Sequence, residues 1–265
     1  MSSYKTLIYS SQGGVVTITL NRPEKRNALT PVMMEELIAA LDEAAAAAEC
    51  GVLVLTGAGD AFCAGLDLEH LESLATKTAE QHQEDTVRVA KMFRALYDFP
   101  KPTIAAVNGA AIAGGMGLAT ICDFTLAVSD AKFGYTEVKI GFVPALVSSF
   151  LMLQVGEKAT RDLLLTGRLF KAHEAHTLGL VNDIVAADDL DERVRRLSQL
   201  LLQNSPESLW ATKRLLADHS RARLDAEIAT SIEHNAASRQ TADFQEGIRA
   251  FLEKRAPVWP SNKSK

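Results

Sequence analysis

The feature that most constrains the fold of this chain is a unit that occurs twice: a short apolar run, a loop containing glycine, and the start of a helix. The first unit joins the run 52–56 to TGAGDAFCAGLDL at 56–68, and the second joins 102–107 to NGAAIAGGMGL at 108–118. Short apolar runs bounded by glycine are typical of buried strands. The two units therefore predict an α/β core in which each strand leads through a loop to a helix.

Further strands and a helix are predicted in the first half of the chain. The runs VVTITL at 15–20 and DFTLAV at 123–128 have the length and the β-branched content of strands. A helix is predicted over 31–50, where helix-forming residues predominate. Thr30 is its predicted N-cap and Pro31 its first residue, because proline is well tolerated there.

The rest of the chain is predicted to be mainly helical. One polar helical segment is expected over 67–98 and another over 148–167. The segment 172–185 predicts a helix that stops at Gly179 and is followed by a strand. From about residue 188 onward only helices are expected.

The composition excludes several classes of protein. The chain has 265 residues with 47% hydrophobic and 23% charged residues, which suits a globular protein with a sizeable core. Its net charge of −5 and scattered basic residues argue against nucleic-acid binding. No apolar run reaches the ~20 residues of a membrane span, and the N-terminus lacks a signal-peptide core. Three cysteines without metal-ligand spacing predict reduced thiols and a cytoplasmic protein.

Three interpretations compete for the glycines of AIAGGMGLAT at 111–120: a phosphate loop, close packing, or backbone N–H groups that face developing negative charge. The phosphate loop fails, because Leu118 and Ala119 stand where a P-loop needs Lys and Ser/Thr, and Thr120 breaks a dinucleotide fingerprint. The other two remain open. Orphan N–H groups at a helix start can stabilise an oxyanion.

Among the titratable residues, Glu137 has the most informative setting. It lies in FGYTEVKIGFVP, an apolar and irregular segment, where its pKa could be raised to suit a general base. The alternative is a surface charge or a partner for Lys139. His173 and His176 of HEAH lack further metal ligands nearby, so a solvated helix face and no metal site are expected. The other histidines lie in polar helical stretches and suggest no function.

Five motifs in order resemble the enoyl-CoA hydratase/isomerase, or crotonase, superfamily over about residues 4–255. They are NRPEKRNAL (21–29), GAGDAFCAGLDL (57–68), KPTIAAVNGAAIAGGMGLATICDF (101–124), AKFGYTEVKIGFVP (131–144) and AHEAHTLGLVNDIV (172–185). The resemblance implies an α/β spiral of ββα units over 1–198, carrying an acyl-CoA site, and a helical C-terminal oligomerisation region over 199–265. It also implies a homo-oligomer, a trimer or a dimer of trimers, with no cofactor beyond the coenzyme A of the substrate.

The resemblance also implies site residues. The N–H groups of Ala64 and Gly114 would bind the thioester oxygen, and Glu137 would move the proton. Phe251 and Lys254 would reach the coenzyme A of a neighbouring subunit. The remaining substrate-binding residues that it implies are Lys25, Ala28, Gly65, Leu66, Asp67, Gly115 and Gly117.

The chain departs from the hydratase pattern at one of two glutamates. Gly117 stands where hydratases of the superfamily carry the first, whereas Glu137 matches the second. One carboxylate suffices to move a proton from C2 to C4, so a Δ3 to Δ2 enoyl-CoA isomerase is expected. Hydration of an enoyl-CoA, including branched or methylglutaconyl-type substrates, is the alternative, with Asp67, Glu69 or Glu72 as replacement acid. A non-catalytic acyl-CoA-binding or scaffold protein is the alternative of another class.

The segment after Glu137 departs as well. Hydratases commonly have a glycine-rich stretch there, but this chain has GFVPALVSSF at 141–150, so a more apolar wall is expected. Ala145 stands where dienoyl-CoA isomerases carry an aspartate, which argues against that subtype.

Overall fold

Six strands form the main sheet of the computed structural model, which describes residues 4–263. Its order is β1-β2-β3-β5-β7-β10, with β1 antiparallel to β2 and the other neighbours parallel. The strands are β1 (Leu7–Gln12), β2 (Val15–Leu20), β3 (Val52–Gly57), β5 (Thr103–Val107), β7 (Phe124–Val128) and β10 (Asp183–Val185). The strands predicted from the apolar runs are confirmed.

The positions of the strands of a second, smaller sheet were not located from the sequence. Its order is β4-β6-β8-β9, and its strands are β4 (Ala61–Cys63), β6 (Ala110–Ile112), β8 (Lys132–Gly134) and β9 (Leu169–Lys171). Each of β4, β6 and β8 follows a long strand of the main sheet. This alternation of long strand, short strand and helix matches the predicted ββα units. Three-residue strands have no periodicity that a sequence could show.

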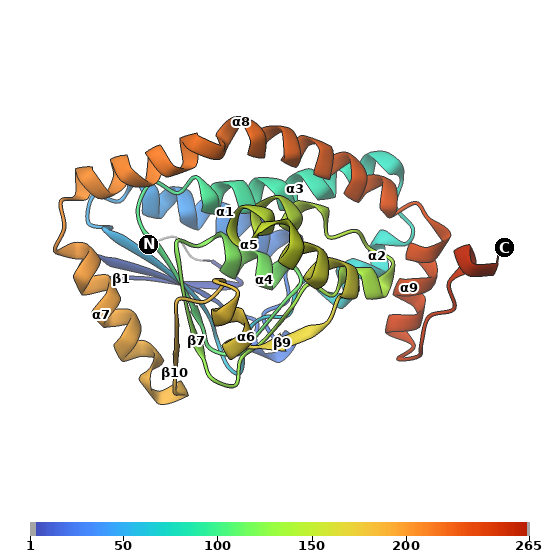
Figure 1. Cartoon of the computed structure of the whole chain (residues 1–265), viewed down its shortest axis with the longest axis horizontal. Helices are drawn as coiled ribbons and strands as arrows, with labels where there is room; N and C mark the ends of the chain where they lie inside the picture. Colours follow the sequence, from blue (N-terminus) through green and yellow to red (C-terminus); the bar gives the residue numbers. More distant parts are fainter. Residues whose placement is uncertain (1–3, 264–265) are drawn as a thin grey trace.

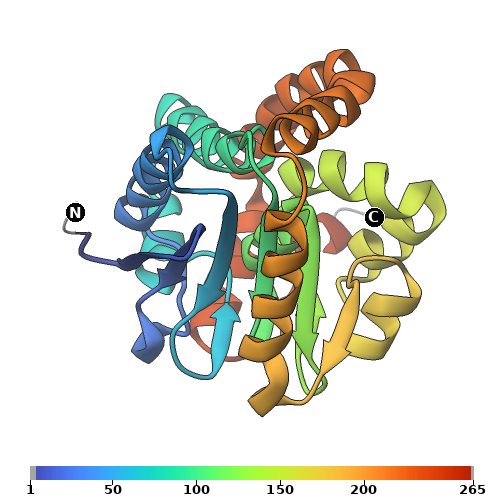
Figure 2. The same ribbon diagram turned by 90° about the vertical axis from the view of Figure 1, so that its left-hand side faces the viewer.

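Helices cover the sheets and form the C-terminal region (Figures 1 and 2). They are α1 (Pro31–Ala46), α2 (Leu68–Leu74), α3 (Ala79–Tyr97), α4 (Gly114–Ile121), α5 (Ala145–Thr166), α6 (Ala172–Thr177), α7 (Leu190–Leu202), α8 (Pro206–Ser238) and α9 (Ala242–Leu252). The predicted cap is confirmed, because the Thr30 side chain accepts from the Met33 N–H. The single helix expected over 67–98 is instead two, since a capping box at Thr78 starts α3 afresh.

The predicted boundary between residues 198 and 199 falls inside α7. This helix packs on β7 and β5 and belongs to the core, so the helical extension begins only with α8. The extension is not separate from the core either. In Figure 1, α8 lies across the top of the molecule over α3 and α5, and α9 descends beside α2. It therefore helps to build the substrate-sized cavity described below.

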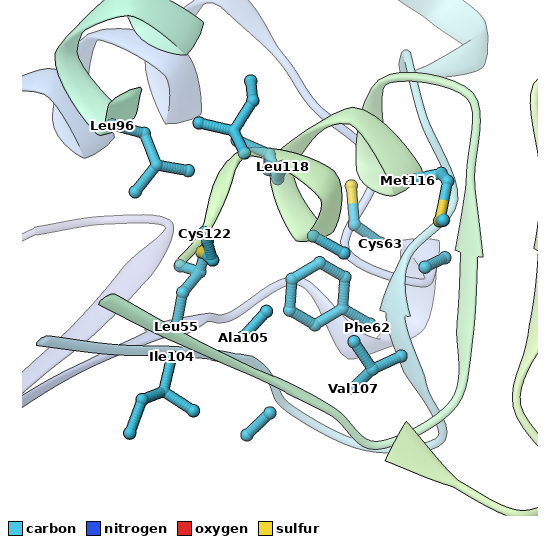
Figure 3. Close-up of a cluster of buried hydrophobic side chains, with 14 of the residues drawn as sticks. Leu55, Phe62, Cys63, Leu96, Ile104, Ala105, Val107, Met116, Leu118 and Cys122 are labelled. Carbon is cyan, nitrogen blue, oxygen red and sulfur yellow. The ribbon is translucent and has the colours of Figure 1, made fainter. Parts of the chain in front are cut away.

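A dense apolar core connects the two glycine-containing loops to the main sheet. Phe62 and Cys63 from β4 pack near Met116 and Leu118 from α4, over Val107 of β5 (Figure 3), and all five are fully buried. Close packing of this kind transmits small displacements rather than absorbing them. The core therefore fixes the two loops relative to each other. No helix among residues 4–263 is long and apolar enough to cross a membrane.

Candidate active site

A cavity of about 610 Å³ lies between the two loops, the segment around Glu137, and the C-terminal helices. Its exposed side is lined by Glu24, Lys25 and Arg26, and its interior mostly by apolar side chains such as Leu71 and Phe93. A concave, largely apolar site with few polar groups is typical of small-molecule binding. Of the predicted binding residues, those that line it are Lys25, Ala28, Leu66, Asp67, Phe251 and Lys254.

The first loop is held in place by the buried side chain of Asn27. Its Nδ2 donates to the carbonyls of Ala58 and Ala61 at 2.9 and 2.7 Å, and its Oδ1 accepts from the Arg22 N–H at 2.9 Å. These bonds satisfy backbone groups that a buried loop would otherwise leave unpaired. Asn27 thus fixes the path of the chain on both sides of the cavity mouth.

Ala64 does not offer the free N–H that the resemblance implied. Its N–H donates to the Arg26 carbonyl at 3.0 Å, so this donor is already engaged. Two residues later, Leu66 forms a parallel bridge with Leu29. The Leu29 N–H donates to the Gly65 carbonyl, and the Asp67 N–H donates to the Leu29 carbonyl. The N–H of Leu66 therefore faces away from Leu29, and among the described residues it has no acceptor.

The second loop supplies the matching donor. Gly114 is the first residue of α4, and its N–H has no acceptor in the described part of the chain. Gly65 lies against this loop, where a Cβ would sit 3.1 Å from the Ile112 carbonyl oxygen and 3.8 Å from the Gly114 nitrogen. Gly65 also has a φ of +89°, which favours glycine. The missing Cβ brings the two unpaired N–H groups of Leu66 and Gly114 to neighbouring positions.

Three predicted binding glycines serve packing instead, and none of them lines the cavity. Gly65 allows the loop contact just described. At Gly115 a Cβ would lie 2.2 Å from the Cys63 carbonyl oxygen, a distance that only glycine avoids. At Gly117 it would lie 2.8 Å from Val147 Cγ1 and 2.9 Å from Phe93 Cζ. Apolar side chains therefore occupy the space that a glutamate at this position would need.

Ala113 precedes α4 in a conformation that L-residues rarely adopt, with φ +50° and ψ −121°. Such a residue carries roughly 1–3 kcal/mol of strain. Replacement of Ala113 by glycine is expected to raise the free energy of unfolding by about 1 kcal/mol, since the relieved strain exceeds the added chain entropy. Chemical denaturation measures it. In the control variant Ala119→Gly, inside the same helix, the free energy of unfolding should instead fall by about 1 kcal/mol. A lower free energy of unfolding in both variants would contradict strain at Ala113.

Glu137 begins a short 3-10 turn, Glu137–Ile140, and faces the cavity. Its Oε2 is buried and has no hydrogen-bond partner among the described residues. Burial raises the pKa of this carboxyl to about 7, whereas its own backbone N–H opposes the shift. Of the two interpretations of Glu137, the raised pKa agrees with this setting, and the surface charge does not. A carboxyl with this pKa can accept and return a proton near neutral pH.

The predicted replacement acids do not serve as proton donors in this structure. Asp67 lines the cavity, but it caps α2 and pairs with Arg22 at 2.9 Å. Burial opposes its ionisation, yet the Arg22 contact holds the pKa of Asp67 below its usual range. Glu69 and Glu72 are exposed. Glu24 also lines the cavity, but on its exposed side. Among the described lining residues, Glu137 is therefore the one carboxyl group with a buried oxygen that has no partner, as suits proton transfer.

The C-terminal helices close the cavity of their own chain. Phe251 and Lys254, predicted to reach a neighbouring subunit, line this cavity from α9 and the turn after it. Asn235 and Arg239 line it from α8, and sequence reasoning missed both. Sequence reasoning also assigned no function to His70, in a polar helical stretch, although its side chain is buried against Asp85. Polar residues on a long helix give no sequence signal for burial, because α8 has no consistently apolar face.

The geometry defines the class of site. Two unpaired N–H groups from different loops lie beside each other, and a buried carboxyl with a pKa near 7 faces the same cavity. Such donors can bind a carbonyl oxygen that gains negative charge, while the carboxyl moves a proton. The arrangement suits chemistry at the carbon next to an acyl carbonyl group.

Comparison with known proteins identifies the family. The enoyl-CoA hydratase/isomerase family matches residues 10–262. A Thermus thermophilus protein provisionally named as an enoyl-CoA hydratase is 46% identical over 95% of this chain and 99% of its own. The 2,3-dehydroadipyl-CoA hydratase of Escherichia coli is 35% identical over 95% of this chain and 97% of its own. This chain belongs to the enoyl-CoA hydratase/isomerase family.

A solved structure supports the same conclusion. An enoyl-CoA hydratase/isomerase from Xanthobacter autotrophicus Py2 superposes with a TM-score of 0.88 at 31% identity, covering 96% of this chain and 98% of that one. The crotonase fold predicted from the five motifs is thereby confirmed. The protein is an enzyme of this family, and an acyl-CoA substrate fits its membership.

Proposed function

We propose that this enzyme shifts the double bond of an enoyl-CoA from C3–C4 to C2–C3, with Glu137 as its single acid–base group. The supporting observation is the packing at Gly117, where even a Cβ would lie 2.8 Å from Val147 Cγ1 and 2.9 Å from Phe93 Cζ, so this position has neither a second carboxylate nor ready space for one. Hydration needs an activated water and a proton donor, and loss of one such group typically costs a factor of ~10²–10⁴. Isomerisation needs only one group that carries the same proton between two carbons.

The proposed reaction proceeds in two proton transfers. Glu137 takes a proton from C2, and the resulting dienolate places negative charge on the thioester oxygen. The N–H groups of Leu66 and Gly114 stabilise this charge without reorganising, an effect worth roughly 10²–10³ in rate for each donor. Glu137 then returns the proton to C4. The substrate already contains coenzyme A, and no bond to a further cofactor forms.

Hydration is the second candidate, because the named relatives cited above are hydratases. Two assays on purified protein separate the candidates by the absorbance of the conjugated thioester. A rise with a trans-3-enoyl-CoA supports isomerisation, since conjugation forms. A fall with a trans-2-enoyl-CoA, without activity on the 3-enoyl substrate, would contradict the proposal and establish hydration.

The pH dependence of kcat/KM is expected to report the raised pKa of Glu137. The free enzyme must hold this carboxyl ionised, so kcat/KM should fall tenfold per pH unit below a midpoint near pH 7. Initial rates between pH 5 and 9, corrected for enzyme stability, measure it. A midpoint near the 4.5 of an ordinary glutamate would mean that the base is solvated.

A homo-oligomer is a separate proposal. Leu215 and Leu216 on α8 are 57% and 62% exposed, and contiguous apolar surface is often covered by a partner. Light scattering is expected to give a mass three or six times 28.7 kDa. A mass of 28.7 kDa would contradict it.

A further inference from the structure

The buried side of the cavity contains a cation that the proposed proton transfer does not use. Arg239 is 1% exposed and lines the cavity from α8, beside Asn235 from the same helix. The cavity is otherwise lined largely by apolar side chains, among them Leu71, Val89, Ala145 and Leu146, and Phe142 lies against the guanidinium. Charged residues are rarely buried to this extent without a specific partner.

The guanidinium of Arg239 has more N–H donors than its protein partners use. Nη1 donates to Asp85 Oδ2 at 2.6 Å, and Nε donates to Asn235 Oδ1 at 3.1 Å. Nη2 has no acceptor among residues 4–263. Nη2 is not one of the described polar atoms that are fully enclosed without a partner, and Arg239 lines the cavity, so the two N–H groups on Nη2 are available to a group bound there.

Asn235 holds the guanidinium in place. Its Oδ1 accepts from both Arg239 Nε and Thr86 Oγ1, and its Nδ2 donates to the Val143 carbonyl at 2.9 Å. The Arg239 guanidinium also stacks on the Phe142 ring, 4.9 Å from its centroid. Such fixed geometry lowers the entropy cost of binding an acceptor.

The charge on Arg239 is only partly compensated. Asp85 is the single carboxylate in contact with it, and Asp85 is shared with His70 at 2.9 Å and with Arg88 at 3.4 Å. Burial lowers the pKa of the neighbouring His82, and the positive charge of Arg239 lowers it further. The negative charge of Asp85 raises this pKa but does not offset the other two effects. The cluster therefore favours an additional negative charge on the cavity side.

We propose that Arg239 recognises an acidic or anionic oxygen group at the far end of the acyl chain, so that the preferred substrate is the coenzyme A thioester of a dicarboxylic acid. This inference rests on the proposed function of the cavity as an acyl-CoA site. A planar guanidinium binds a carboxylate with short, charge-assisted hydrogen bonds. An alkyl end in the same position would leave the buried Nη2 donors unpaired, which is the origin of strong discrimination between substrates.

The position of Arg239 suits a short chain. The Phe142 N–H donates to the Glu137 carbonyl at 3.0 Å, so the backbone of Phe142 lies directly beside the proposed base. Arg239 stacks on the ring of that same phenylalanine. The length of one phenylalanine side chain thus connects the Glu137 segment to the guanidinium, and we expect a short acyl chain to cover it.

Binding of unreactive saturated thioesters tests the proposal without requiring turnover. Adipyl-CoA and hexanoyl-CoA form one matched pair, and suberyl-CoA and octanoyl-CoA form a second. In each pair the acyl chain of the first compound ends in a carboxylate, whereas that of the second ends in a methyl group. Calorimetry on the wild-type protein at pH 8 is expected to show at least tenfold tighter binding of the dicarboxylic member in one pair. Equal affinities, or tighter binding of the methyl-ended members, would overturn the proposal and leave solvent as the partner of Arg239.

Two variants assign the preference to Arg239. The double variant Asp85→Leu with Arg239→Met removes both buried charges together, which is far better tolerated than removal of one. It should lose the preference, so that its affinities for adipyl-CoA and hexanoyl-CoA become equal. Arg195→Met, an exposed arginine on α7, is the control and should keep the preference. A double variant that still prefers adipyl-CoA would refute a role for Arg239, whereas no binding of any thioester to wild type would contradict the acyl-CoA site itself.

Discussion

Replacement of Glu137 by glutamine is expected to reduce the rate of double-bond migration by a factor of ~10²–10⁴, because the amide cannot accept the proton from C2. The amide has the size of the carboxyl group and fits the same space. Substrate affinity should therefore change little, and the loss should appear in kcat. Steady-state rates with a trans-3-enoyl-CoA, together with calorimetric binding of a saturated acyl-CoA, separate the two quantities.

The same substitution is expected to stabilise the fold at alkaline pH. The carboxyl has an ordinary pKa of 4.5 and a folded-state pKa of about 7, so the folded protein holds its proton more tightly than the unfolded chain. Stability is therefore lost as pH rises from about 4.5 through 7. The glutamine variant escapes this loss, which corresponds to at most about 3 kcal/mol at pH 8.

Chemical denaturation of both proteins at pH 5 and pH 8 measures the effect. The gain should be present in full at pH 8 and should fall to about 1 kcal/mol or less at pH 5. A matched control is Glu192→Gln, on an exposed carboxyl of α7 that pairs with Arg195 and Arg196, and it should show no gain. Equal stability of wild type and Glu137→Gln at both pH values would show that Glu137 is ionised at no cost, and therefore solvated.

Replacement of Asp85 by alanine is expected to lower the free energy of unfolding by about 3–5 kcal/mol, because it leaves the buried Arg239 without a counter-charge. Both side chains are 1% exposed, and they lie 2.6 Å apart. The pair joins α3 to α8 and thereby ties the C-terminal extension to the core. Equilibrium denaturation in urea at pH 7 measures the loss.

The stability contributed by Asp85 also depends on pH in a definite direction. Burial opposes its ionisation, but the contacts with His70 and Arg239 hold the pKa of Asp85 well below its usual range. Its contribution is therefore complete above the unfolded pKa of 3.8 and disappears as pH falls below it. The control Glu192→Ala removes an exposed carboxylate with two arginine partners and should change the free energy of unfolding far less, because exposed ion pairs contribute little to stability. If Asp85→Ala and Glu192→Ala lowered the free energy of unfolding by similar amounts, a stabilising buried ion pair between Asp85 and Arg239 would be contradicted.

Local patterns explain why much of the fold was predictable. The run at 15–20 became β2 with the predicted bounds, and the run at 52–56 became β3 with one further residue, because short runs rich in apolar and β-branched residues favour strands. Thr30 and Pro31 likewise determine where α1 begins. The boundary at 198 was wrong, since the sequence of α7 is helical like that of α8 and does not reveal that only α7 packs on the sheet.

The candidate site was predictable to the extent that its residues belong to contiguous motifs. The sequence by itself determined that Glu137 lies in an apolar segment and that two glycine-bearing loops begin helices, because local composition controls both. Only the tertiary structure decided that Leu66, rather than Ala64, keeps a free N–H, since this depends on which backbone groups pair across the bridge to Leu29. It alone also placed Arg239 opposite Asp85, 154 residues apart in the chain, because burial and charge pairing between distant helices arise from packing that no local pattern records.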